Sequence, residues 1–446
     1  MIWSHVHLRV LSHAICIAYI IYNLFTVDEQ FLSSNDFAEK FQAFGKDSFI
    51  HYFFLIITEI GFPGTLGIVA VVAIFHPKKR LSFRVVFFYA LIGFIVGVSK
   101  MWYGYQRPWF VDNDIIVYKC SSTDFGRPSG HAFCSLFSVL LLYHKYIYEP
   151  TFQARNSEPN TRSSTDGSLP TLSVIIHEEG NTKSIEPAQS TLKAKLWNVV
   201  ILVLLLIFLF LVGLSRVYLG DHSTDQVLLG WAFGMICFVE CIYFCDEQLD
   251  RFIEFLVTKT WKTKNWFVPF MVLGYLLTLA IPAILEVKNN DQGTFKPEWL
   301  ANIQRRCPDS SPESEIVNKS FYLCITGVCC FGLIIGLMFA PNDIFEHEPF
   351  EWTKRYVGKK LIAGAILAVI GAALYFGIGS LDPWVVFMIK YNLLCLVLPI
   401  LAFIVIPGIW KYIPGLKPEV KVCDSAQLSM EMTDSQIIRP AVPKIQ

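Results

Sequence analysis

Three short stretches of the sequence bring together basic residues, histidines and a Ser-Gly turn: SKMWYGYQRPW, FGRPSGHAF and SRVYLGDHSTDQVLLG. The residues concerned are Lys100, Arg107, Ser129, Gly130, His131, Arg216 and His222. Fixed cations and the free N–H groups at the start of a helix are suited to bind a phosphate dianion. Two histidines suit a two-step transfer, in which one attacks phosphorus and the other protonates the leaving oxygen and then activates water.

The same stretches offer no cluster of carboxylates that would hold a metal ion. Negative charge that develops on the phosphate would then be stabilised by the Lys and Arg side chains. We therefore expect chemistry that uses no metal and no cofactor.

The composition indicates a protein that crosses a membrane several times. Of the 446 residues, 54% are hydrophobic and 17% are charged, against roughly 25% charged residues in soluble domains. The mean hydropathy is +0.47. The formal net charge is zero, so nothing points to a nucleic-acid partner, and we expect membrane lipid as the surroundings.

About ten apolar runs approach the roughly 20 residues that a transmembrane helix needs. They lie near 10–26, 50–75, 83–99, 131–147, 196–214, 226–245, 266–286, 320–340, 360–379 and 385–409. Only helices fit, because backbone groups in lipid must be hydrogen-bonded within their own segment. We predict an all-α polytopic transmembrane protein whose first helix is a retained signal anchor.

Lysine and arginine in the short loops predict the orientation of these helices. Basic residues gather in the loops after the second, sixth and eighth runs, and all three loops fall on one side of a ten-span arrangement. Such loops face the cytoplasm, so both termini are expected there. The three polar stretches then lie at span ends on the opposite, lumenal face, and topology alone predicts that they meet.

The same pattern divides the chain into four regions. Residues 1–49 hold the signal-anchor helix and a lumenal loop, and 50–245 hold the six helices that carry the polar stretches. Residues 246–411 hold about four further transmembrane helices, and 412–446 form a disordered cytoplasmic tail. Residues 149–195 are rich in Ser, Thr, Asn, Pro and Glu, which predicts a disordered cytoplasmic insertion.

The three stretches resemble the signature of the type-2 phosphatidic acid phosphatase/haloperoxidase superfamily. That signature reads Lys, six residues, Arg-Pro; then Pro-Ser-Gly-His; then Ser-Arg, five residues, His. The resemblance implies a six-helix phosphatase core that hydrolyses a phosphate monoester through a phosphohistidine, without a metal. Carried over by position, His222 would be the nucleophile and His131 the general acid. The residues that would hold the phosphate are Lys100, Arg107, Ser129, Gly130 and Arg216.

The sequence departs from this signature four residues after His222. The superfamily has an Asp there that hydrogen-bonds the nucleophile, whereas this chain has Gln226, with Asp225 one position earlier. Both positions share a helix face with His222, so either side chain could orient it. We favour Gln226 for this role and Asp225 as a helix cap, because the glucose-6-phosphatase branch is similar in having Gln at this position.

That branch is also similar at Gln106-Arg107-Pro108, at Pro297-Glu298-Trp299 and in the four helices after the core. The similarity implies hydrolysis of a soluble sugar phosphate in the lumen of the endoplasmic reticulum. Two alternatives stay open. A lipid phosphate would suit a site at the depth of lipid headgroups, and the same core could also serve a non-enzymatic membrane protein.

Four polar residues near the motifs invite further expectations. Arg127 is either a fourth cation for the phosphate or a solvated loop charge, and Asp221 is expected to face water. Cys120 and Cys307 fall in polar loops on the oxidising side, so a disulfide between them is possible.

Overall fold

The computed structural model describes an all-α protein. The described residues are 2–45, 49–64, 66–69, 71, 79–118, 120, 123–149, 187–258, 265–308, 312–339, 354–377 and 383–402, and none of them is in a strand. The helices are α1 (Ile2–Phe25), α2 (Val27–Gly45), α3 (Phe49–Glu59), α5 (Lys79–Tyr103), α6 (Pro108–Val111), α7 (Gly130–Tyr143), α9 (Pro187–Tyr218), α10 (Thr224–Glu240), α11 (Asp246–Thr258), α13 (Val268–Asp291), α14 (Pro297–Arg306), α15 (Pro312–Phe339), α16 (Lys354–Gly377) and α17 (Pro383–Ile400). Shorter π- or 3-10 turns are η1 (Ile60–Gly64), η2 (His144–Tyr148), η3 (Cys241–Cys245) and η4 (Asn265–Phe267).

Each of the ten apolar runs overlaps a described helix, so the predicted helical membrane fold is confirmed. Among the described residues, five stretches are long and apolar enough to cross a membrane by length and composition: Phe49–Val69, Arg80–Val111, Leu196–Tyr218, Thr224–Thr258 and Asn265–Asp291. A sixth is the pair Arg9–Phe25 and Val27–Gly45, if this pair, bent by 91°, counts as one span. Shorter apolar helices lie at Leu323–Phe339 and Leu361–Ala373.

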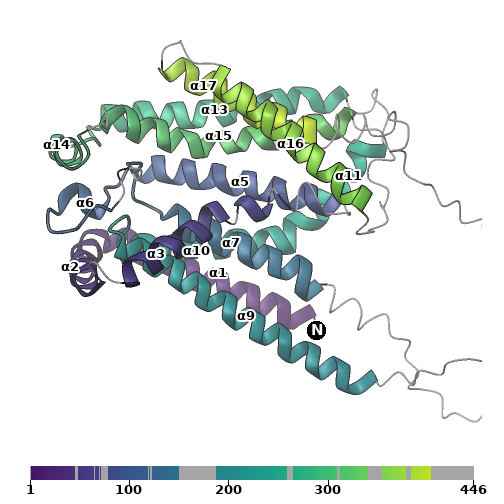
Figure 1. The fold of residues 1–446 in the computed structure, drawn as a ribbon, viewed down its shortest axis with the longest axis horizontal. Coiled ribbons are helices and arrows are strands. Elements are labelled where there is room, and N and C mark those ends of the chain that lie inside the picture. Colours follow the sequence, from purple (N-terminus) through teal and green to yellow (C-terminus); the bar gives the residue numbers. More distant parts are fainter. Residues whose placement is uncertain are drawn as a thin grey trace, which may run out of the picture.

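The long helices lie side by side, and α2, α6 and α14 gather at one end of the bundle, which we call the site end (Figure 1). Helix α15 packs along α5 and α17, while α10 packs on α7 and α1. The largest buried cluster joins α5, α7, α11 and α15, with Phe83, Phe133, Phe137, Ile253 and Leu333 in its interior. This apolar core fixes α5 and α7, which carry the first two polar stretches.

Three segments predicted as loops contain helices instead. Residues 27–45 form α2, residues 246–258 form α11, and Pro297–Arg306 forms α14. Helix α2 has no apolar run because part of its buried face is polar, with Ser34, Asn35 and Gln42 among its buried residues. The predicted insertion 149–195 and tail 412–446 lie largely or wholly outside the described residues, except that α9 already begins at Pro187.

Helix α2 is tied by hydrogen bonds to the turns that carry the third polar stretch. The hydroxyl of Ser34 accepts from the backbone N–H of Thr224 (2.5 Å), at the first residue of α10. The Gln42 amide donates to the carbonyls of Tyr218 (2.8 Å) and Ile116 (3.1 Å). Its oxygen accepts from the N–H of Ile116 (2.8 Å). The N-terminal helices therefore hold the site end in place from outside.

Helix α14 is joined to the loop after α6 by a disulfide between Cys120 and Cys307, as the sequence allowed. Trp299 and Ile303 of α14 are buried against Trp109 and Phe110 of α6. Since α6 directly follows Arg107, this contact fixes the backbone on which Arg107 stands.

The Gln42 contacts predict a measurable loss of stability when its amide becomes a carboxylate. Gln42→Glu keeps the shape but turns a donor that serves two carbonyl oxygens into an acceptor. An unsatisfied buried group of this kind costs about 1–3 kcal/mol. We expect a lower melting temperature for the detergent-solubilised variant than for the wild type. Gln292→Glu, at an exposed position, is the control and should melt like the wild type. Equal melting of both variants would contradict the role of Gln42.

Candidate active site

The turn that presents His222 folds back onto the helix before it. Helix α9 ends at Tyr218, and Gly220 follows with φ +72°, a left-handed conformation that favours glycine. The N–H groups of Asp221 (3.1 Å) and His222 (3.2 Å) then donate to the carbonyl of Arg216. The six-residue spacing from Arg216 to His222 is thus the length of chain that returns the imidazole to the end of α9.

The His222 ring is held at one nitrogen and faces a cation at the other. Its Nδ1 lies 2.7 Å from the Gly126 carbonyl and 3.2 Å from Oε1 of Gln226. Both neighbours are acceptors, so the ring proton sits on Nδ1. The lone pair of Nε2 then faces Nη1 of Arg107, 3.3 Å away. This tautomer leaves Nε2 unprotonated and directed toward the basic residues.

Gln226 contacts both His222 and the start of its own helix. Its Oε1 accepts from the N–H of Ser223 (3.4 Å), the N-cap of α10, so Ser223 and Gln226 form a Ser-x-x-Gln capping box. Its Nε2 donates to the carbonyl of Gln106 (2.8 Å), which fixes which end of the amide faces the histidine. The side chain that touches His222 is therefore Gln226.

Asp225 has a different set of contacts. Its carboxylate accepts from the Ser223 hydroxyl, and its second oxygen is buried with no hydrogen-bond partner among the described residues. It lies in the first turn of α10, where negative charge stabilises a helix.

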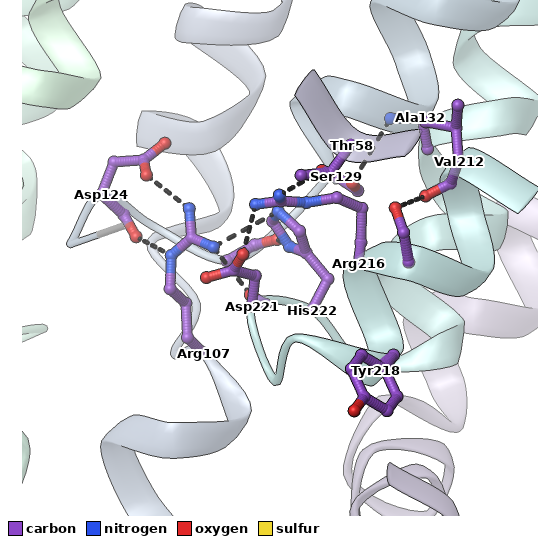
Figure 2. Close-up of polar contacts among 12 residues, drawn as sticks. Thr58, Arg107, Asp124, Ser129, Ala132, Val212, Arg216, Tyr218, Asp221 and His222 are labelled. Atoms are coloured by element: carbon purple, nitrogen blue, oxygen red, sulfur yellow. Dashed lines mark hydrogen bonds and ion pairs between the residues drawn. The ribbon is translucent and has the colours of Figure 1, made fainter. Parts of the chain in front are cut away.

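Two basic residues share one carboxylate that was not singled out in the sequence. Lys100 Nζ lies 2.9 Å from Oδ2 of Asp124, and Nη2 of Arg107 pairs with Oδ1 of the same side chain. The loop backbone supports both cations, because Lys100 donates to the Phe125 carbonyl (2.5 Å) and Arg107 Nε to the Asp124 carbonyl (2.7 Å). Figure 2 shows Arg107 between Asp124 and His222.

Arg216 is paired with Asp221, so the expectation that Asp221 faces water is wrong. Its Nη2 lies 2.6 Å from Oδ2 of Asp221, and both side chains are buried. A solvated Asp221 would leave a buried guanidinium without a counter-ion, which is costly. The Arg216 Nη1 donates to the Thr58 hydroxyl (2.7 Å) of α3 (Figure 2).

The Pro-Ser-Gly-His turn starts α7 beside the same cations. Ser129 is the N-cap; its hydroxyl accepts from Ala132 (3.4 Å), and its N–H donates to the carbonyl of Gln226 (3.0 Å). A Cβ on Gly130 would lie 3.6 Å from Cε of Lys100, so this backbone runs along the lysine side chain. The first N–H groups of α7 have no acceptor within the helix and so can serve an anion.

His131 lies close enough to the three basic residues to interact with them electrostatically. Its ring packs on Phe62 of η1, with centroids 5.2 Å apart. The three polar stretches therefore meet at the site end, and His131, His222 and their cations share one cluster.

Arg127 is buried, at only 2% exposed, which contradicts the expectation of a solvated loop charge. It donates to the backbone carbonyl (3.1 Å) and the side chain of Asn23 on α1. Its guanidinium also lies over the rings of Tyr103 and Tyr105. These contacts tie the loop before α7 to the N-terminal helix.

The surroundings keep His222 neutral and Asp124 charged. Burial lowers the pKa of the His222 imidazole well below its ordinary value, and the nearby cations, Arg107 first, lower it further. Burial alone would raise the pKa of Asp124, but Arg107 and Lys100 outweigh it and hold that pKa below its ordinary value. An uncharged imidazole therefore faces a cluster of charged residues. Within the described ranges, no three His, Cys, Asp or Glu side chains gather so as to hold a metal ion.

Asp124, Asp221 and Thr58 contact the predicted site residues but were not predicted as part of the site. The signal available for the two acids was electrostatic. Asp124 directly precedes the second polar stretch and Asp221 lies inside the third, in chain segments that must bury several cations. Thr58 comes from a helix that carries none of the motifs, so spacing could not reveal it.

Comparison with known families gives one match. Residues 82–249, less than half of the 446 residues, match the model of the PAP2 superfamily. The matched range contains every predicted site residue from Lys100 to Gln226. Neither the curated proteins nor the solved structures give a significant match. The match implies phosphatase chemistry on a phosphate ester.

The close fit around Gly126 can be tested by adding one carbon. A Cβ there would lie 2.5 Å from the Gln106 carbonyl and 2.9 Å from both polar atoms of the Gln226 amide. Gly126→Ala must therefore displace backbone or the amide that contacts His222, at a cost of about 1–3 kcal/mol. We expect a lower melting temperature in detergent. Gly358→Ala, where a Cβ meets nothing within 4 Å, is the matched control; if the two variants melt alike, the described packing is wrong.

Proposed function

We propose that the protein is an integral-membrane phosphatase that hydrolyses a phosphate monoester through a phosphohistidine on His222. The observation that carries this proposal is the unprotonated Nε2 of His222, which faces Arg107 beside Lys100 and Arg216. A neutral imidazole with its proton fixed on the far nitrogen can attack phosphorus, and buried cations stabilise the charge that develops on the phosphate oxygens.

In the first step, Nε2 of His222 forms a bond to phosphorus and the bond from phosphorus to the ester oxygen breaks. His131, in its imidazolium form, gives a proton to that leaving oxygen and becomes neutral. In the second step, His131 takes a proton from water, the water oxygen bonds to phosphorus, and the bond to His222 breaks to release phosphate. Gln226 and the Gly126 carbonyl hold the Nδ1 proton of His222 throughout. Lys100, Arg107, Arg216, Ser129 and the Gly130 N–H hold the phosphate.

Within this class we favour a soluble sugar phosphate, hydrolysed in the lumen of the endoplasmic reticulum as by glucose-6-phosphatase. The contact between Gln226 and His222 supports this branch, because the branch carries Gln where the superfamily carries Asp. Trp299 of the Pro-Glu-Trp segment is buried next to Phe110 of α6, the helix that directly follows Arg107, which also supports this branch. The disulfide between Cys120 and Cys307 supports an oxidising compartment on this side.

A lipid phosphate is the second candidate substrate. It is favoured by the position of the site at the end of apolar helices, where a lipid headgroup would lie. A non-enzymatic membrane protein on the same core is the third reading, and the same experiment addresses all three.

The purified protein is assayed on glucose 6-phosphate and on phosphatidate in detergent, with labelled phosphate used to trap the intermediate. We expect release from the sugar phosphate, and acid-labile label on the wild type. His222→Ala should lose at least about a thousandfold in turnover and all of the label, since the nucleophile is gone. His7→Ala, on an exposed position of α1, is the control. Preferred turnover of phosphatidate would favour the lipid candidate, and equal release from wild type and His222→Ala would falsify the enzyme.

The contacts of Gln226 and Asp225 predict opposite sensitivities. Gln226→Ala removes the acceptor that lies 3.2 Å from His222 Nδ1, and loss of such an orienting partner lowers turnover by roughly ten- to a hundredfold. Asp225→Asn keeps an acceptor for the Ser223 hydroxyl and does not touch His222, so turnover should barely change. A larger loss in Asp225→Asn than in Gln226→Ala would show that the acid orients the histidine.

A further inference from the structure

Asp124 pairs with two of the three proposed phosphate-binding cations. Its two carboxylate oxygens are divided between Lys100, at 2.9 Å, and Arg107. Its side chain is 15% exposed, compared with 2% for Lys100 and 3% for Arg107. The Asp124 side chain is therefore less deeply buried than the two cations that it pairs with.

The donors that Asp124 occupies are the ones a phosphate on His222 needs. Arg107 Nη1 is directed to His222 and to the Asp221 carbonyl (2.7 Å), while Nη2 is paired with Asp124. Two-point binding of a phosphate by a guanidinium uses two N–H groups that lie side by side. The phosphate can take Nη2 and the lysine only when the carboxylate releases them.

The net charge of the ion-paired residues also favours displacement of Asp124 by phosphate. Counting side chains in direct ion pairs, three cations (Lys100, Arg107 and Arg216) face two carboxylates (Asp124 and Asp221), which leaves one net positive charge. A phosphate monoester carries about −1.5 to −2 charges at neutral pH. An ionised Asp124 beside the bound phosphate would therefore repel it, because like charges at short distance in a buried site are unfavourable.

Asp124 can move away without disturbing the nucleophile, whereas Asp221 cannot. Asp221 directly precedes His222, and its backbone N–H donates a hydrogen bond to the Arg216 carbonyl. Displacement of Asp221 would therefore shift His222. Asp124 stands in the loop between α6 and α7, and it is not a chain neighbour of either histidine. The cations keep backbone acceptors when its carboxylate leaves, through the carbonyls of Phe125 and Asp124 itself.

We propose that Asp124 is an internal counter-ion that occupies Lys100 and Arg107 until phosphate displaces it, and that it thereby weakens phosphate binding and favours product release. The proposal rests on the proposed function of the same site. It makes Asp124 a positioning residue whose carboxylate competes with the phosphate group shared by substrate and product.

The test is the affinity of the full-length protein for inorganic phosphate, measured by titration calorimetry in detergent. Asp124→Asn removes the charge and keeps the shape, and it should bind phosphate at least about tenfold more tightly. Asp124→Glu keeps the charge and should bind like the wild type. A purely structural role predicts the opposite result, since loosened cations would bind phosphate more weakly in both variants. Unchanged or weaker binding by Asp124→Asn overturns the proposal.

Asp114→Asn, which removes a charge from an exposed position of the same loop, is the matched control and should bind phosphate like the wild type. If Asp124→Asn does not elute as a folded species, Asp124→Ala replaces it, and this variant should also bind phosphate more tightly than the wild type. Failure of the proposed function can be distinguished from failure of the Asp124 proposal, because in the first case the wild type releases no phosphate from any ester. If the wild type hydrolyses an ester and Asp124→Asn does not bind phosphate more tightly, only the competition by Asp124 is wrong.

Discussion

The burial of three cations at one end of an apolar bundle is the constraint on which the rest of the site depends. Lys100, Arg107 and Arg216 are each at most 4% exposed, and an unpaired charge in such a place costs several kcal/mol. Each of them is paired with a carboxylate, and Lys100 and Arg107 also donate to backbone carbonyls of the turns around them. The paths of the loop before α7 and of the turn before α10 follow from the need to supply these acceptors.

The same constraint explains why the site is built from helix ends rather than helix middles. Only at an end can the backbone offer unpaired N–H groups to an anion and carbonyls to a cation. The N–H of Ser129 donates to the carbonyl of Gln226, which joins the starts of α7 and α10 into one unit. Close packing of these helices requires Gly230, because a Cβ there would lie 2.6 Å from the Ser129 carbonyl.

The sequence was sufficient to predict the helices and the meeting of the three motifs, because both follow from patterns along the chain. Apolar runs of span length must be helical in lipid, and an alternating topology places the ends of neighbouring spans at one face. The partners of the charges could not be predicted in this way. Asp221 was expected in water, yet the turn after α9 buries it against Arg216. Arg127 is buried against Asn23 of α1, a partner that only the tertiary fold brings near. Helix α2 was not predicted because polar residues such as Ser34 make its contacts with α10, so its sequence contains no apolar run.

Gln226 shows how local and electrostatic requirements combine at one position. A capping box accepts Glu or Gln three residues after the N-cap, but this side chain must also donate to the carbonyl of Gln106, which a carboxylate cannot do. A carboxylate here would, in addition, be a third acid beside Asp124 and Asp221 and would cancel the net positive charge that attracts phosphate. It would stabilise the imidazolium form of His222, whereas attack on phosphorus needs the neutral ring. An amide fixes the tautomer, caps the helix and leaves the cluster with its net positive charge, so the two acids already paired with the cations account for an amide rather than a third carboxylate at this position.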